Sequence, residues 1–328
     1  MKTITSGLLL ATLAASVSAV PFNHAYGNSN GGHVRPTWSP PSASSAAAPE
    51  STASSTSAST VAATSVASSI VAASSAVVAS SAVILAASAA SPTVYMCGDS
   101  TMALGGGGTG TQGWGVYLPY SLTVPVVNDA KAGRSARSYT DENRFGAVID
   151  TIKSGDIVII EFGHNDGGSL TPTDNLRSDC VGAGNETCTT DAGVIVQTYP
   201  TYLTNATELM TAKGAHVIIS SPTPDNTCET GTCSYTSPRF TGYGKIVVEN
   251  VGSMASFIDH GTYLANQYAV LGATTVDTYY PNDHTHTSPI AADLVAGVFV
   301  KGVLCAGSSN PLYSYIKNST DSVVGTCI

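Results

Sequence analysis

From residue 92 onward, short apolar runs alternate with longer stretches in which apolar and polar positions mix. Five of the runs are apolar on both faces, a pattern typical of strands that are buried in a parallel sheet. The predicted strands are TVYMC (93–97), TVPVV (123–127), DIVIIEF (156–162), HVIIS (216–220) and ATTVDTY (273–279).

The stretches between these strands repeat apolar residues at helical spacing. The predicted helical ranges are 144–155, 199–215, 243–273 (long enough for two helices) and 288–305. The last range begins with Ser288-Pro289, a good N-cap followed by proline at the first helical position. Alternation of strands and helices predicts βαβ units and a doubly wound α/β fold, whose ligands bind beyond the carboxyl ends of the strands.

Residues 1–91 differ in composition from the rest of the chain. Lys2, a short apolar run and a small-residue cleavage site at Val17-Ser18-Ala19 predict a secretory signal peptide over residues 1–19. Residues 20–91 are poor in large apolar side chains and rich in Ser, Ala and Thr, which predicts a disordered, O-glycosylated linker with a cell-wall association. Residues 71–90 have the length of a membrane helix, but their serines and alanines disfavour insertion, so no membrane partner is expected.

Charge narrows the choice of partners. Of the 328 residues 11% are charged, and the formal net charge is −9. A nucleic-acid partner would require a basic face, so this balance argues against one. Residues 92–328 are enough for one sizeable core, and we expect them to form a single domain that acts as a monomer.

Seven cysteines become disulfide candidates if the chain is secreted. The sequence-local candidate pairs are Cys180 with Cys188, Cys228 with Cys233, and Cys305 with Cys327. Cys97 is then left over inside the first apolar run, where we expect a buried thiol. Candidate N-glycosylation sites of the Asn-X-Thr type are Asn185, Asn205 and Asn318.

The first predicted strand runs directly into Gly98-Asp99-Ser100-Thr101. A serine in this position either caps a helix or acts as a nucleophile held at the end of a core strand. A nucleophilic serine needs a base to take its proton and donors to receive the oxyanion, so the later loops decide between the two roles.

Two later loops offer oxyanion donors. Gly133 follows the second strand, and its backbone N–H can point into a cleft; Asn165 follows the third strand, and its side-chain amide can donate. Each also has an ordinary role, as a loop glycine or in an Asx turn. His164 is a candidate base, although its closeness to the strand favours packing or a backbone hydrogen bond.

Asp283 and His286 lie three residues apart, just before the last predicted helix. A short turn would fold the carboxylate against the imidazole Nδ1–H and leave Nε2 free to face a serine. Asp283, His284 and His286 could instead ligate zinc, but no further ligand set is evident, so no metal or organic cofactor is expected. No G-x-S-x-G motif surrounds Ser100, unlike the nucleophile-elbow enzymes.

Together, four blocks resemble a known family. GDST (98–101), NDAKAGRSARS (128–138), GHNDGG (163–168) and DHTHTSP (283–289) resemble the SGNH, or GDSL-like, hydrolases, and the likeness extends from about residue 92 to the end. Long blocks such as VVNDAKAGRSARSYT are most similar to the fungal rhamnogalacturonan acetylesterases of that family. The Ser/Ala tract, the Cys228/Cys233 pair and Cys97 depart from the family pattern.

The resemblance implies a flavodoxin-like αβα sandwich with a five-stranded parallel sheet. It implies a secreted serine esterase that removes acetyl groups from a plant cell-wall polysaccharide, most closely acetylated rhamnogalacturonan, through an acetyl-serine intermediate. The roles that it implies are Ser100 as nucleophile, His286 as base, Asp283 as its orienting partner, and the N–H groups of Ser100 and Gly133 with the Asn165 side chain as oxyanion hole.

Substrate contacts are expected near these blocks. Arg134 and Arg137 are candidates for holding a galacturonate carboxylate, or else for pairing with nearby acids such as Asp141. Trp114 lies in a glycine-rich run (105–115) and is a candidate for stacking on a sugar or for core packing. Two other classes of protein remain open, namely a lipase or thioesterase of the same superfamily and a non-catalytic cell-wall or carbohydrate-binding protein.

Overall fold

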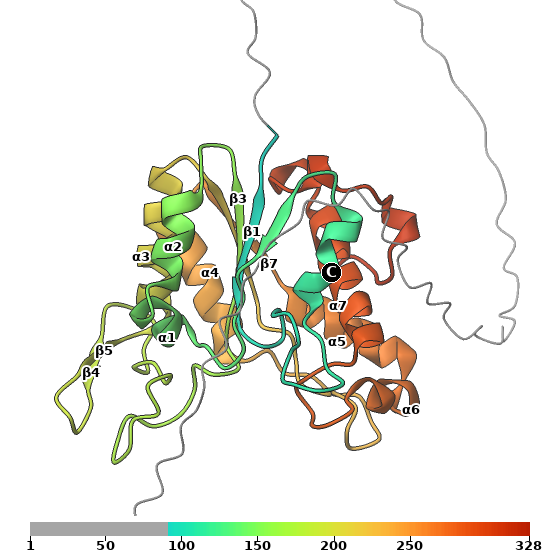
Figure 1. The fold of residues 1–328 in the computed structure, drawn as a ribbon. Helices are drawn as coiled ribbons and strands as arrows, with labels where there is room; N and C mark the ends of the chain where they lie inside the picture. The colour runs from blue at the N-terminus through green and yellow to red at the C-terminus, as the bar shows by residue number, and fades with distance from the viewer. Residues whose placement is uncertain (1–90) are drawn as a thin grey trace, which may run out of the picture. The chain divides into compact units, whose positions relative to one another are not determined.

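The computed structural model describes residues 91–328, so the predicted signal peptide and, apart from its last residue, the predicted linker lie outside the described residues. Within the described range, a five-stranded parallel sheet has helices on both sides (Figure 1). The strands are β1 (Val94–Gly98), β2 (Val126–Asn128), β3 (Ile157–Glu161), β6 (His216–Ser220) and β7 (Ala255–Ile258). This confirms the predicted doubly wound α/β fold.

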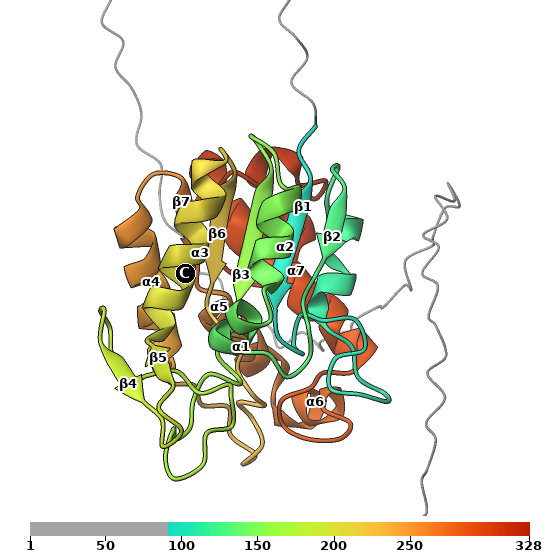
Figure 2. The same ribbon diagram turned by 60° about the vertical axis from the view of Figure 1, so that its left-hand side comes forward.

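The strand order is β2-β1-β3-β6-β7, as Figure 2 shows across the face of the sheet. All neighbouring strands in this sheet pair in parallel. Because the strands are parallel, all their amino ends lie at one end of the sheet, where the described chain enters β1. The loops that follow the strands lie together at the other end, beyond the carboxyl ends of the strands. The reversal of direction between β2 and β3 places a topological switch point at the carboxyl ends of β1 and β3.

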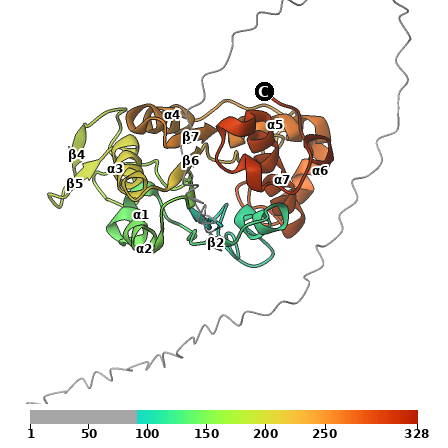
Figure 3. The same ribbon diagram turned by 90° about the horizontal axis from the view of Figure 1, so that it is seen from above.

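Two groups of helices cover the two faces of the sheet (Figure 3). The helices on one side are α1 (Ala136–Asp141), α2 (Arg144–Thr151), α3 (Tyr199–Ala212) and α4 (Arg239–Val251). The helices on the other side are α5 (His260–Leu271), α6 (Ala273–Val276) and α7 (Pro289–Ala306). Short 3₁₀ turns complete the structure at Trp114–Val116, Leu118–Ser121, Asp277–Tyr279, Gly307–Ser309, Tyr313–Tyr315 and Thr320–Ser322.

Alternation along the central strands fills both cores. In β1, Val94 and Met96 belong to the core beneath α5 and α7, whereas Tyr95 and Cys97 belong to the core beneath α1–α4. Successive side chains of a strand point to opposite faces, so a run that is apolar throughout is what a doubly covered strand requires. Cys97 is the buried free thiol that the sequence predicts, and burial raises its pKa to about 12.

The fifth strand is not the one predicted. Residues 273–279 form α6 and a 3₁₀ turn, with Val276 and Tyr279 buried three residues apart as in a helix. The fifth strand is instead β7, inside the range 243–273 that was predicted to be helical. Gly252, with φ +86°, ends α4 in a backbone conformation that favours glycine, and a four-residue strand follows before α5 begins.

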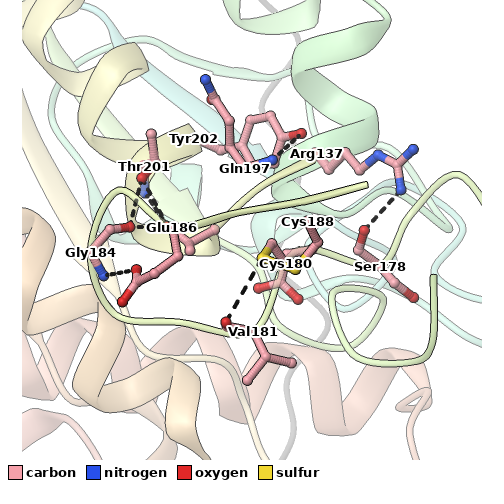
Figure 4. The surroundings of a disulfide bond; sticks show 12 residues. Arg137, Ser178, Cys180, Val181, Gly184, Glu186, Cys188, Gln197, Thr201 and Tyr202 are labelled. Carbon is pink, nitrogen blue, oxygen red and sulfur yellow. Dashed lines mark hydrogen bonds between the residues drawn. A yellow bond between two sulfur atoms is a disulfide. The ribbon is translucent and has the colours of Figure 1, made fainter. Parts of the chain in front are cut away.

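A further antiparallel pair lies outside the main sheet, formed by β4 (Thr187–Thr189) and β5 (Ile195–Gln197). The disulfide between Cys180 and Cys188 ties this pair to the loop that follows β3 (Figure 4). The structure confirms all three candidate disulfides, which also include Cys228–Cys233 and Cys305–Cys327.

Helix α7 begins as predicted, because the Ser288 side chain accepts a hydrogen bond from the backbone N–H of Ala291 and Pro289 occupies the first turn. By length and composition, the segment Pro289–Ser309 is apolar enough to cross a membrane. Most of it is buried within the fold, however, and its side chains belong to the core beside the sheet. The apolar stretch at 71–90 lies outside the described residues.

Candidate active site

The switch point of the sheet collects the residues that the sequence singled out. Ser100 follows β1, Gly133 follows β2 and Asn165 follows β3. Asp283 and His286 lie in the loop between the 3₁₀ turn Asp277–Tyr279 and α7, and this loop brings His286 to Ser100. The sequence predicts a strand before that last loop, whereas the structure has a helical segment there.

Ser100, His286 and Asp283 form a continuous chain of hydrogen bonds. The distance from Ser100 Oγ to His286 Nε2 is 2.8 Å, and the distance from His286 Nδ1 to Asp283 Oδ2 is also 2.8 Å. A carboxylate only accepts hydrogen bonds, so Nδ1 carries a proton and Nε2 of the neutral ring accepts from the hydroxyl. This is the arrangement in which an imidazole can take the proton of a serine.

The turn at residues 283–286 is built around the Asp283 carboxylate. Oδ1 accepts the backbone N–H groups of Thr285 and His286, at 2.8 and 2.7 Å, so that Oδ2 is left for the imidazole. Burial by itself would raise the pKa of Asp283, but the hydrogen bonds from the His286 ring and from these two N–H groups lower it to about 2. The partner of His286 is therefore an anion across the ordinary pH range.

Ser100 is 5% exposed and does not cap a helix, because turns rather than a helix follow it. The turn is held by buried Asp99, whose Oδ1 accepts the backbone N–H of Thr101 at 2.9 Å and its hydroxyl at 2.8 Å. Burial raises the pKa of Asp99. Asp99 thus holds the turn in shape through Thr101, and the Ser100 side chain contacts His286.

Three potential oxyanion donors come from loops that contact one another. Gly133 has φ +76°, a conformation that favours glycine, and within residues 91–328 neither its N–H nor that of Ser100 donates to another group. Asn165 Nδ2 donates one hydrogen to the carbonyl oxygen of Arg134 at 3.1 Å, and Asn165 Oδ1 accepts a hydrogen bond from Arg177 Nη1 at 3.2 Å. The second Nδ2 hydrogen remains for a ligand.

The alternative base and the alternative zinc site do not form. His164 Nε2 lies 2.8 Å from the carbonyl oxygen of Thr223, and its Nδ1 lies 3.6 Å from Asp225, so its hydrogen bond goes to the loop after β6 rather than to Ser100. His284 lies 3.8 Å from Glu229. No group of three or more His, Cys, Asp and Glu side chains in the described part of the chain is suited to hold a metal ion.

Trp114 packs in the core, which is one of the two roles that the sequence left open, so the sugar-stacking role is wrong. The side chain is fully buried, its ring lies 4.9 Å from that of Phe299, and Nε1 donates to Glu161 Oε1 at 2.8 Å. The glycine-rich run before it has a different role. A Cβ added at Gly107 would lie 2.4 Å from Cγ of His286, so the absence of a side chain there makes room for the imidazole.

Arg137 is also unavailable to a substrate, which corrects a second prediction. It is 2% exposed and donates to both carboxylate oxygens of Asp174 at 2.8 and 2.7 Å. It also donates to the carbonyl of Ser178 at 3.0 Å (Figure 4). Arg134 is partly exposed and pairs with Glu142 at 2.9 Å. Sequence reasoning missed Arg177, which reaches Asn165 from the loop after β3.

The model of the GDSL-like lipase/acylhydrolase family matches residues 94–297, which is more than half of the chain. The chain belongs to this family. Within the matched region lie Ser100, Gly133, Asn165, Asp283 and His286.

Two relatives of this GDSL-like hydrolase bear the name rhamnogalacturonan acetylesterase, one of them as a probable assignment. The chain is 50% identical over 218 residues to a rhamnogalacturonan acetylesterase of Emericella nidulans, a match that covers 66% of this chain and 86% of that protein. It is 27% identical over 221 residues to the probable rhamnogalacturonan acetylesterase YesY of Bacillus subtilis, covering 64% of this chain and 91% of that protein.

Among solved structures, the hydrolase is similar to the protein YxiM of Bacillus subtilis. The TM-score is 0.51 at 21% sequence identity, and the match covers 65% of this chain and 56% of that chain. At this identity the likeness supports the fold alone, and it agrees with the observed αβα arrangement.

Proposed function

We propose that this GDSL-like hydrolase is a serine esterase that removes acetyl groups from a plant cell-wall polysaccharide, with acetylated rhamnogalacturonan as its main substrate. The observation that carries the proposal is the hydrogen-bonded chain Ser100–His286–Asp283 in a protein that is half identical to a rhamnogalacturonan acetylesterase. The proposal assigns catalytic roles to these three residues and to the donors around them.

In the first half of the reaction, Ser100 Oγ attacks the acetyl carbonyl while His286 Nε2 takes the hydroxyl proton. The C–O bond to the sugar breaks, and the imidazolium returns the proton to the departing sugar oxygen, which leaves acetyl-serine. In the second half, His286 takes a proton from water, the resulting hydroxide attacks the acetyl carbon, and acetate leaves as Ser100 Oγ regains a proton. Asp283 keeps Nδ1 protonated and stabilises the transient imidazolium.

Negative charge develops on the acetyl oxygen in both halves. The N–H groups of Ser100 and Gly133 and the free Nδ2 hydrogen of Asn165 would receive it, and loss of one such donor typically lowers kcat about 100- to 1000-fold. These donors are fixed before the substrate arrives, because Asp166 Oδ1 accepts the backbone N–H of Ala136 at 2.7 Å and so joins the loops after β2 and β3.

We place the reaction outside the cell. Three disulfides support this, since such bonds persist in oxidising compartments. Of the candidate glycosylation sites, Asn185 and Asn205 are exposed and Asn318 is half-buried, so the first two are the better acceptors. Association with the cell wall through the Ser/Thr-rich tract belongs to the same proposal.

The test is acetate release by the wild type and by Ser100→Ala from acetylated rhamnogalacturonan, acetylated pectin and acetylated xylan. We expect release to be fastest from rhamnogalacturonan and the variant to lose at least about 10⁴-fold in kcat. Ser154→Ala, which changes an exposed serine before β3, serves as the matched control and should keep full activity. An active Ser100→Ala enzyme would refute the serine mechanism.

A second arm separates the acetylesterase from a lipase or thioesterase of the same superfamily. The rates of hydrolysis of 4-nitrophenyl acetate and 4-nitrophenyl octanoate are compared under the same conditions. Preference for the acetyl ester is expected. Preference for the octanoyl ester would contradict a sugar deacetylase, and no hydrolysis of any ester would favour a binding protein.

A further inference from the structure

Arg177 differs from the other arginines of the described chain. Within residues 91–328 each of the others forms an ion pair with an aspartate or glutamate, and these are Arg134, Arg137, Arg144 and Arg239. Arg177 is exposed and forms none, and its one hydrogen bond from the guanidinium goes to Asn165 Oδ1 at 3.2 Å. An unpaired cation therefore lies beside the proposed oxyanion hole.

Arg177 lines a cavity of about 500 Å³ that begins at the oxyanion loop. The cavity walls include Gly133, the cations Arg134 and Arg177, and the acids Asp141 and Glu142. Because Gly133 belongs both to this cavity and to the oxyanion hole, a polysaccharide with its acetyl group at Ser100 would extend a neighbouring unit into this space. Glu142 pairs with Arg134 and Asp141 pairs with the buried Arg137, so Arg177 is the lining cation that no carboxylate of the described residues pairs.

The loop that carries Arg177 is fixed in shape. Asn175 Oδ1 accepts the backbone N–H groups of Arg177 and Ser178, at 2.9 and 2.8 Å. Leu176 has φ +62°, an unusual conformation for leucine, and remains 65% exposed. The buried Arg137 anchors the same loop through Asp174, so one arginine holds the loop that presents the other.

We propose that this cavity binds the carboxylate of a uronic acid unit of the bound polysaccharide, with Arg177 as its main donor and Leu176 against the apolar face of the sugar ring. This inference rests on the proposed polysaccharide deacetylase function. Carboxylate binding suits Arg177, because a guanidinium offers paired N–H donors that match the two carboxylate oxygens, and only one donor is spent on Asn165.

The test compares two forms of one acetylated, uronate-containing oligosaccharide, the natural form and a form with its carboxyl groups reduced to alcohols. The measured quantity is the ratio of kcat/KM for the two forms, for the wild type, Arg177→Gln, Arg177→Lys and the charge-matched control Lys153→Gln. Lys153 is exposed at the opposite edge of the sheet, just before β3. The ratio cancels any general loss that Arg177→Gln causes through Asn165.

For the wild type we expect a ratio of about 10 to 100 in favour of the charged form, as for a hydrogen bond to a charged group. Arg177→Gln should bring the ratio close to 1, Arg177→Lys should keep part of it, and Lys153→Gln should leave it unchanged. A wild-type ratio near 1, or an unchanged ratio in Arg177→Gln, overturns the carboxylate site alone. If the wild type deacetylates neither form yet hydrolyses 4-nitrophenyl acetate, the proposed polysaccharide function falls together with this inference.

Discussion

His286 is held from three directions. Asp283 binds Nδ1, Ser100 binds Nε2, and Gly107 leaves room beside the ring. The first two contacts orient the imidazole through hydrogen bonds, whereas the third works through the absence of a side chain. Since misplacement of a catalytic group by about 1 Å can cost about 100-fold in rate, the space that Gly107 leaves beside the ring also bears on the proposed catalysis.

We therefore predict that Gly107→Ala lowers kcat about 10- to 100-fold, because the new Cβ would overlap the His286 ring. The free energy of unfolding should change by less than about 1 kcal/mol, since the loop lies at the surface. Steady-state kinetics and denaturant unfolding check the two quantities. Thr109→Ala in the same loop is the control, and equal activity of both variants would contradict a role of Gly107 in placing His286.

At the scale of single residues, the sequence selects Ser100, Asp283 and His286, which the structure joins by hydrogen bonds, but it places the surrounding side chains poorly. Ser100, Asp283 and His286 lie in short motifs whose spacing suits one chemistry. Trp114 and Arg137 lie near such motifs in sequence, but their side chains turn into the core, and adjacency along the chain does not tell which way a side chain points. Arg177 contacts Asn165 only because the long loop after β3 folds back to the site, and no local sequence pattern predicts the path of such a loop.

Among the elements, the end of β3 is the best anchored. Buried Glu161 accepts hydrogen bonds from Trp114 Nε1 at 2.8 Å and from the hydroxyl of Ser220 at 2.5 Å, and lies 2.8 Å from His260 Nδ1. The network joins β3 to β6, to α5 and to the 3₁₀ turn at Trp114. Because Asn165 follows β3 closely, a firmly held strand end also fixes this donor.

Trp114→Phe keeps an aromatic ring in the core but removes the donor to Glu161. We expect a loss of about 1–3 kcal/mol in the free energy of unfolding, the usual cost of leaving a buried charged or polar group without its partner. KM for acetylated oligosaccharide should stay within about twofold, since the side chain does not face the substrate. Chemical denaturation measures the stability, and initial rates measure KM. Tyr313→Phe, at an exposed site, is the control. A large rise in KM without loss of stability would instead support the stacking role of Trp114.

The elements themselves divide by how completely they are buried. Strands β1, β3 and β6 are buried almost along their whole length, and their unbroken apolar runs made them predictable. Strand β7 has only Ile258 fully buried, so its composition is mixed and it was hidden in a helical stretch. β4 and β5 are three residues each, too short to show a hydrophobic periodicity in the sequence. A disulfide joins β4 to the loop after β3.

The whole molecule carries several buried carboxyl groups on the side of the active site. Burial raises the pKa of Asp99 and Asp166, and it raises that of Asp179 to about 6 despite the nearby Arg239. An unfolded chain ionises such groups near pH 4. Between these pH values the folded protein holds protons that the unfolded chain has released, so rising pH weakens the fold.

We predict that the free energy of unfolding falls as pH rises from about 4 to about 6, with Asp179 alone contributing about 1–3 kcal/mol. Asp179→Asn should flatten the dependence, whereas Asp150→Asn, at an exposed site on α2, should not. Denaturant unfolding at a series of pH values measures this. A stability that is constant or increases over the same interval would be inconsistent with protonated carboxyl groups in the folded state.

The direction of β1 has a practical consequence. The described chain enters β1 at the amino end of the strand, whereas Ser100 follows its carboxyl end, so residue 91 and Ser100 lie at opposite ends of the sheet. A carrier or a bead coupled at residue 91 is therefore attached away from Ser100. A bulky, insoluble polymer can then be approached without the tether standing in the way.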